Sequence, residues 1–142
     1  MRRARKRSFG LTFAMVVAIA SGACNLLNDA TSPSTPAPST STETFGGTVG
    51  VQGSSRSTFA VAQQGTVTVT LSALSPSVAM GLGIGTPNGS TACAMTSSTT
   101  TALPGSTPQL TVTEPPGNYC VSVYDVGNVT GTVTYSVIVA HP

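Results

Sequence analysis

The feature of this sequence that most constrains its fold is a strict alternation of apolar and hydroxyl-bearing residues. Across residues 66–72, valine or leucine occupies every second position, and threonine or serine fills the positions between them. Because successive side chains of a β-strand point to opposite faces, this pattern gives one apolar face and one hydroxyl face. The alternation recurs at residues 49–51, 59–61, 110–112, 119–123 and 133–139. We therefore predict a strand at each of these places.

The rest of the chain from residue 44 to residue 142 supports an all-β fold. Its 14 valines and 18 threonines make up about a third of the segment, and such β-branched side chains suit a pleated surface. Turn-forming residues separate the apolar runs at 63–65, 75–77, 86–89, 104–105, 115–118 and 127–128. Seven or eight short strands at this spacing predict an antiparallel β-sandwich, immunoglobulin-like or jelly-roll-like, over residues 44–142.

The first 23 residues have the pattern of a secretory signal peptide. Five of the six cationic residues lie within the first seven positions, ten apolar residues follow at 11–20, and small residues come next. As a helix, ten residues rise about 15 Å, which is about half of the bilayer core. We therefore predict a cleaved signal helix over residues 1–23 and an exported protein.

Residues 20–24, Ala-Ser-Gly-Ala-Cys, resemble the lipobox of bacterial lipoproteins. The resemblance implies that Cys24 becomes the acylated amino terminus and holds the protein to the cell membrane or the outer membrane, at the cell surface or in the periplasm. The leucine usual three positions before the cysteine is Ser21 here. The alternative is cleavage by ordinary signal peptidase after Ala23 or Ala20, which would release a secreted protein.

A Ser/Thr/Pro-rich linker follows, and we place it, with Cys24, at residues 24–43. Its stretch at 31–42 has almost nothing to bury, so we expect a solvated, disordered spacer. The order of anchor, spacer and domain is the one expected of a surface lipoprotein.

Three cysteines leave one unpaired in an oxidising compartment. Lipidation of Cys24 would leave Cys93 and Cys120 to form a disulfide. That bridge would join a loop region to the strand that begins at Gly117.

The charge and the side-chain chemistry exclude several functions. Without its signal peptide the chain keeps one cation, Arg56, against four carboxylates, a side-chain charge of −3, so nucleic-acid binding is excluded. The single histidine, His141, is the penultimate residue, where we expect a frayed chain and no held catalytic base. Glu43, Glu114 and Asp125 fall in different turns or in the linker. We predict no catalytic residues, no metal and no cofactor.

Residues 114–124, Glu-Pro-Pro-Gly-Asn-Tyr-Cys-Val-Ser-Val-Tyr, and the Thr-Gly turn and strand at 130–137 resemble the end of the bacterial pre-peptidase C-terminal domains. The resemblance implies a non-catalytic β-sandwich attached to secreted enzymes or surface proteins, some of which bind calcium or polymeric substrates. Where that family tends to carry Asp-x-Asp-Leu, this chain has Val-Ala-Met-Gly-Leu-Gly-Ile at 78–84. We therefore do not expect the calcium site of the family.

The same segment places glycine at 81, 83 and 85 on one face of a strand. One interpretation is close packing of this face against a neighbouring backbone or ring, with Tyr124 as the candidate. The other is a flat patch for self-association or for an incoming strand.

These observations favour a non-enzymatic binding or structural module of the cell envelope, with the membrane and an unidentified protein or polysaccharide as partners. One alternative is a self-assembling surface or fibre subunit. Another is a secreted carbohydrate- or polymer-binding domain, for which Tyr124 could stack on a sugar. Asp125 and Asn128 complete the candidate ligand-binding residues, although one carboxylate is a poor calcium site.

Overall fold

The computed structural model describes residues 39–142, apart from the side chains of residues 97 and 98. The predicted signal peptide, Cys24 and the predicted linker up to residue 38 lie outside these residues. The described part of the chain is all-β, and it contains no helix that is long and apolar enough to span a membrane.

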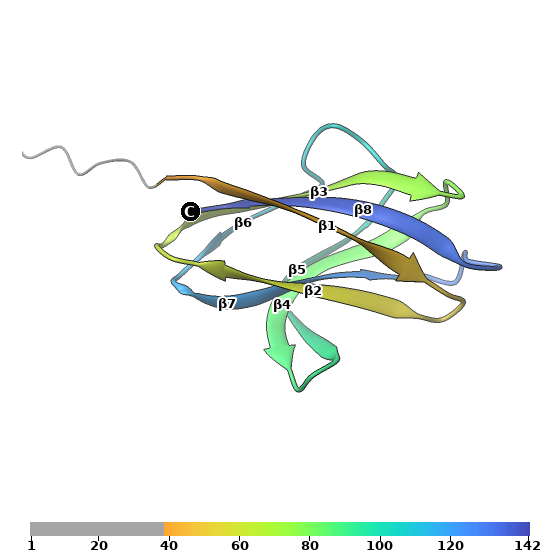
Figure 1. The fold of residues 1–142 in the computed structure, drawn as a ribbon, viewed down its shortest axis with the longest axis horizontal. Coiled ribbons are helices and arrows are strands. Elements are labelled where there is room, and N and C mark those ends of the chain that lie inside the picture. Colours follow the sequence, from red (N-terminus) through yellow and green to blue (C-terminus); the bar gives the residue numbers. More distant parts are fainter. Residues whose placement is uncertain (1–38) are drawn as a thin grey trace, which may run out of the picture. The chain divides into compact units, whose positions relative to one another are not determined.

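Eight antiparallel strands form two four-stranded sheets (Figure 1). The strand order is β1-β8-β3-β6 in sheet A and β2-β7-β4-β5 in sheet B. Every connection except the β4–β5 hairpin therefore passes from one sheet to the other. This is the order of an eight-stranded jelly roll, so the jelly roll and not the immunoglobulin arrangement is the form of the predicted sandwich. The strands are β1 (Ser41–Val49), β2 (Ser54–Val61), β3 (Gly65–Ser75), β4 (Met80–Asn88), β5 (Ala92–Ala102), β6 (Leu110–Glu114), β7 (Gly117–Tyr124) and β8 (Val133–His141).

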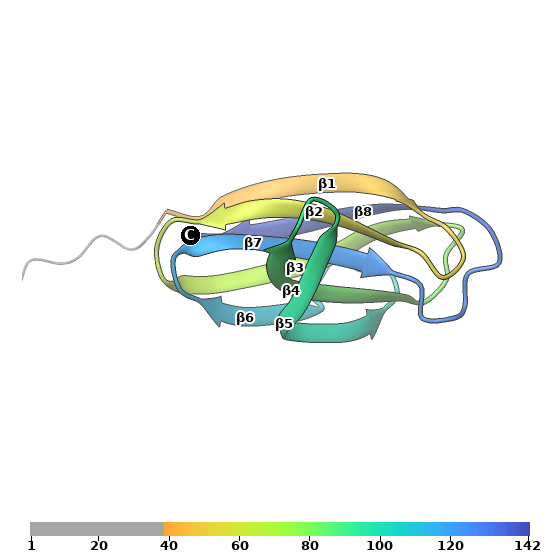
Figure 2. The same cartoon turned by 90° about the horizontal axis from the view of Figure 1, so that it is seen from below.

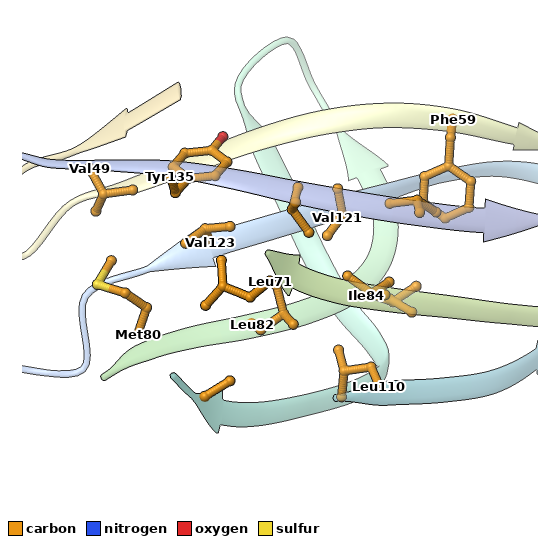
Figure 3. Packing of buried hydrophobic residues seen from close by; sticks show 14 of the residues in the cluster. Val49, Phe59, Leu71, Met80, Leu82, Ile84, Leu110, Val121, Val123 and Tyr135 are labelled. Atoms are coloured by element: carbon orange, nitrogen blue, oxygen red, sulfur yellow. The ribbon is translucent and has the colours of Figure 1, made fainter. Parts of the chain in front are cut away.

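The core lies between the two sheets and is built from the apolar half of each alternating strand (Figure 3). On β3 the side chains of Val67, Val69 and Leu71 are fully buried, as are Leu82 and Ile84 on β4. Threonines alternate with the buried residues of β3 on its outer side. The predicted period of two residues is thus confirmed for the strands that the alternation indicated.

Three details differ from the sequence-based expectation. β1 begins at Ser41, three residues before the expected start of the domain. Val51 lies in the turn after β1 and is 57 % exposed, because the chain turns back at residues 50–53 through a hydrogen bond from Gly53 N–H to the carbonyl oxygen of Gly50. The alternation did not indicate β5, an edge strand that pairs only with β4.

One end of the sandwich holds the start of β1 and the C-terminus, and the other end holds four loops. β1 begins where β8 ends, since Ser41 pairs with His141, and Figure 1 shows the C-terminus at this end. The antiparallel strand order places four loops, at residues 50–53, 76–79, 103–109 and 125–132, at the opposite end. The chain from the predicted spacer thus enters the domain at the end away from these loops.

A candidate binding groove beside a latched hairpin

The hairpin of β4 and β5 leaves sheet B and folds across its outer face. β4 pairs with β7 from Gly81 to Gly85 only, whereas its pairing with β5 continues to Asn88. Between Ile84 and Thr86 the register shifts, so that three residues of β5 lie opposite one residue of β4. Figure 2 shows the end of the hairpin crossing over β7 and β2. A bulge of this kind bends a strand pair locally.

Two contacts hold the hairpin in this position. The predicted disulfide is present: Cys93 of β5 is bonded to Cys120 of β7, and their Cα atoms are 5.9 Å apart. Near the turn, the Nη2 of Arg56 on β2 donates hydrogen bonds to the carbonyl oxygens of Gly89, at 3.4 Å, and Ser90. The Nη1 of Arg56 is buried and has no hydrogen-bond partner within residues 39–142. Arg56, the one lysine or arginine of residues 39–142, is therefore bonded to the hairpin.

The glycine face of β4 is covered, as the first of the two interpretations predicted. Gly81 lies under the ring of Tyr124, its cross-strand partner on β7. A Cβ atom at Gly83 would lie 2.6 Å from the Sδ of Met95, and one at Gly85 would overlap the carbonyl oxygen of Ala94. These positions are glycine because other parts of the chain lie directly on the strand. The flat open patch of the second interpretation is therefore not present.

A groove of about 820 Å³ lies beside the hairpin. Its floor is the outer side of β2 and β7, since its floor residues Thr58, Ala60 and Asn118 are exposed whereas Phe59, Val61 and Tyr119 between them are buried. The hairpin contributes one wall, and β1 contributes Glu43. The lining residues are Glu43, Thr58, Phe59, Ala60, Thr86, Pro87 and Asn118.

The carboxylate of Glu43 is held by His141. The Nε2 of His141 lies 2.9 Å from the Oε1 of Glu43, and the side chains are 6 % and 41 % exposed respectively. Because a carboxylate only accepts hydrogen bonds, the histidine N–H is the donor. The imidazole packs against Phe59, with 5.3 Å between the ring centroids. His141 thus fixes one carboxylate oxygen at the edge of the groove.

The expectation of a frayed His141 is therefore wrong. β8 continues to His141, whose side chain points inward in register with Val133, Tyr135, Val137 and Val139. Glu43 lies in β1 and not in a linker. At this end β8 extends two residues beyond the apolar alternation, which ended at Val139, and β1 begins three residues before the expected start of the domain.

The predicted ligand-binding residues have structural partners at the other end of the domain. Asp125 accepts four backbone hydrogen bonds, from the N–H groups of residues 52, 127, 128 and 129, at 2.7–3.1 Å. The bond from Gln52 contributes most to lowering the pKa of Asp125, and desolvation opposes it. The side chain of Asn128 donates to the carbonyl oxygen of Ala79 at 3.5 Å, and Tyr124 covers Gly81. Three of these bonds go to Oδ1 and one goes to Oδ2, so Oδ1 is saturated and only Oδ2 keeps a free lone pair for a ligand.

Among residues 39–142, no three His, Cys, Asp or Glu side chains lie close enough together to hold a metal ion. No protein-family model matches the chain, and no curated protein shows significant sequence similarity to it.

Proposed function

We propose that the protein is a non-catalytic lipoprotein of the cell envelope, whose jelly-roll domain acts as a binding module on a flexible spacer. The disulfide is the observation that carries this proposal. Because Cys93 pairs with Cys120, two of the three cysteines of the sequence are used within the domain. Cys24, which follows the small residues of the predicted cleavage site, is then available for acylation.

The position of the first strand is compatible with display on a tether. The chain enters β1 at Ser41, beside the C-terminus, so the four loops at residues 50–53, 76–79, 103–109 and 125–132 lie at the opposite end of the sandwich. An extended Pro-rich segment rises about 3.1 Å per residue, so the residues between Cys24 and Ser41 would reach up to about 50 Å. A disulfide also suits a protein that works outside the cytoplasm.

Mass spectrometry of the mature amino terminus tests the proposal. We expect the membrane fraction of a bacterial host to contain a chain that begins at Cys24 and carries acyl groups. The Cys24→Ser variant should lose the acyl mass and leave the membrane fraction. The Cys93→Ala/Cys120→Ala variant serves as the matched control, since it should remain acylated. A wild-type chain that begins at Cys24 with no acyl thioether on its sulfur, or that begins at Asn25, would contradict the proposal.

A further inference from the structure

The side chains of the groove define the chemistry of the ligand it could hold. Thr58 and Thr86 present hydroxyls, Asn118 presents an amide and Glu43 a carboxylate. The lining includes no lysine or arginine, and Arg56 is bonded to the hairpin carbonyls. A phosphate, sulfate or carboxylate ligand would therefore enter a groove that is lined by a carboxylate and by no lysine or arginine to pair with it.

A hydroxyl-rich ligand has the properties that these groups require. Hydroxyl groups both donate and accept, so they can pair with the threonine hydroxyls, with both ends of the Asn118 amide, and with the carboxylate oxygens of Glu43. Ala60 and Pro87 add apolar surface against which the C–H faces of a sugar ring can pack. A cationic peptide is a weaker match, because the one carboxylate of the groove already accepts a hydrogen bond from His141.

We propose that this groove binds an uncharged oligosaccharide. The inference rests on the proposed function only in taking the domain to be a binding module, and it does not depend on the lipid. The volume of about 820 Å³ is within the usual range of small-ligand sites, about 300–1,000 Å³. The groove is open, so a sugar chain can extend beyond it.

The hairpin makes this site depend on its two latches. Thr86 and Pro87 form one wall, and they lie where β4 bends away from β7, at the Cys93–Cys120 bridge, since Pro87 pairs with Cys93. The Arg56 contacts hold the hairpin further along, at Gly89 and Ser90. A wall that is fixed before binding loses little conformational freedom when the ligand arrives. Affinity for the oligosaccharide should therefore fall when the disulfide is reduced.

Isothermal titration calorimetry on the full-length mature protein in detergent tests the inference. The neutral probes are cellohexaose, xylohexaose, mannohexaose and chitohexaose, and the charged probes are hexagalacturonate and hexalysine. We expect at least one neutral probe to bind and neither charged probe to do so. Asn118→Ala should weaken binding about tenfold, the effect of leaving one polar contact unmade. Glu43→Gln, which keeps an acceptor for His141, should weaken it less.

The matched control is Asn88→Ala, which makes the same chemical change on an exposed residue of the hairpin that does not line the groove. Its affinity should equal that of the wild type, and all variants should melt at the same temperature. Binding of no neutral probe, binding of a charged probe instead, or equal affinity in Asn118→Ala and the wild type would each overturn the inference. Mass spectrometry of Cys24 in the same preparation reports separately on the anchor, so the two proposals fail independently.

Discussion

The two outer faces of the sandwich are built from the same alternation, yet they meet the solvent in different ways. The outward positions of sheet A are mainly threonines, none of them is charged, and no other element of residues 39–142 folds over them. They are Thr42, Thr44, Gly46 and Thr48 on β1, Thr134, Ser136, Ile138 and Ala140 on β8, Thr66, Thr68, Thr70 and Ser72 on β3, and Thr111 and Thr113 on β6. On sheet B, the hairpin crosses the outer side (Figure 2), the disulfide ties it to β7, and the ring of Tyr124 lies on Gly81.

The difference shows that a glycine-rich central strand requires a cover that a threonine-rich one does not. Threonine hydroxyls on the outer side of sheet A can donate hydrogen bonds to water and accept them from it, and the β-branched side chain suits a pleated, half-buried surface. The glycines of β4 have no side chains for either purpose, and all three are buried. The cover in turn requires glycine, because a Cβ at these positions would overlap it. The sequence of β4 and the fold of the hairpin therefore depend on each other.

Among the changes that affect the two sheets differently, removal of the disulfide should lower the free energy of unfolding most. Cys93 and Cys120 are 27 residues apart, and closing a loop of this length stabilises a fold by about 3 to 4 kcal/mol in the chain-entropy treatment. We expect the Cys93→Ala/Cys120→Ala variant to have a free energy of unfolding in urea that is lower by about this amount. Wild-type protein treated with a reductant is the control, and it should match the variant. Hydrogen exchange that rises equally in both sheets at low denaturant would show that the latch is not specific to sheet B.

A pair of glycine substitutions compares the two faces directly. Gly85→Ala on sheet B would place a Cβ against the carbonyl oxygen of Ala94 and 2.9 Å from the Cα of Met95, and such overpacking costs about 2 kcal/mol. Gly46→Ala on sheet A would place a Cβ 3.4 Å from the nearest atom, the carbonyl oxygen of Tyr135. We expect it to be neutral or stabilising by about 0.5 kcal/mol. Thermal melts measure both, and equal losses would refute the contrast.

The hydrogen bonds of Arg56 should contribute less to the free energy of unfolding than the disulfide does. Arg56→Met keeps the apolar stem and removes the hydrogen bonds to Gly89 and Ser90. It also removes the buried Nη1 that has no partner, so we expect a net loss of about 1 kcal/mol. Hydrogen exchange should increase mainly at residues 86–94. Unchanged exchange in the hairpin would show that the disulfide alone holds it.

Replacement of Asp125 should have the smallest effect on stability at neutral pH. It should affect both sheets equally, because Asp125 joins the β1–β2 turn to the β7–β8 loop. Its pKa in the folded state is below the ordinary value of 3.8, chiefly because of the bond from Gln52 N–H. Its contribution is therefore complete above the unfolded pKa and is lost as the pH falls through the folded pKa.

Denaturant unfolding at a series of pH values checks this expectation. The free energy of unfolding of the wild type should fall between about pH 5 and about pH 2 more steeply than that of Asp125→Asn, which does not titrate. If the free energy of unfolding falls equally steeply with decreasing pH in both proteins, the carboxylate of Asp125 does not have this role.

The sequence predicted those parts of the fold in which one strand face is buried. The valines of β3 and β8 and the hydroxyls between them leave a period of two that needs no tertiary information. β5 was missed because Ala92–Ala102 has no apolar alternation: the strand lies at a sheet edge, and much of it is exposed. The resemblance to a family and the lipid anchor remain predictions.

The groove was missed because its residues come from four strands, β1, β2, β4 and β7, that are distant in sequence. Thr86 and Pro87 carry the signal of a turn, although β4 continues through them to Asn88. A stricter use of the period would have found part of the site: His141 continues the inward positions of β8, and Glu43 continues those of Phe45, Gly47 and Val49 on β1. Extending the inward positions of β8 from Val139 to His141, and those of β1 from Val49 back to Glu43, places the pair at adjacent strand ends.

The entry of the chain through β1 also determines how the domain would carry mechanical load. In the proposed anchored state, tension from the envelope reaches the sandwich at Ser41 and acts along β1, whose neighbour in sheet A is β8. A counter-force at the four opposite loops would load the nine β1–β8 residue pairs together in shear, instead of opening them one after another. A ligand held beside Glu43 would lie close to the point where the force enters, so most of the jelly roll would stay outside the path of the load.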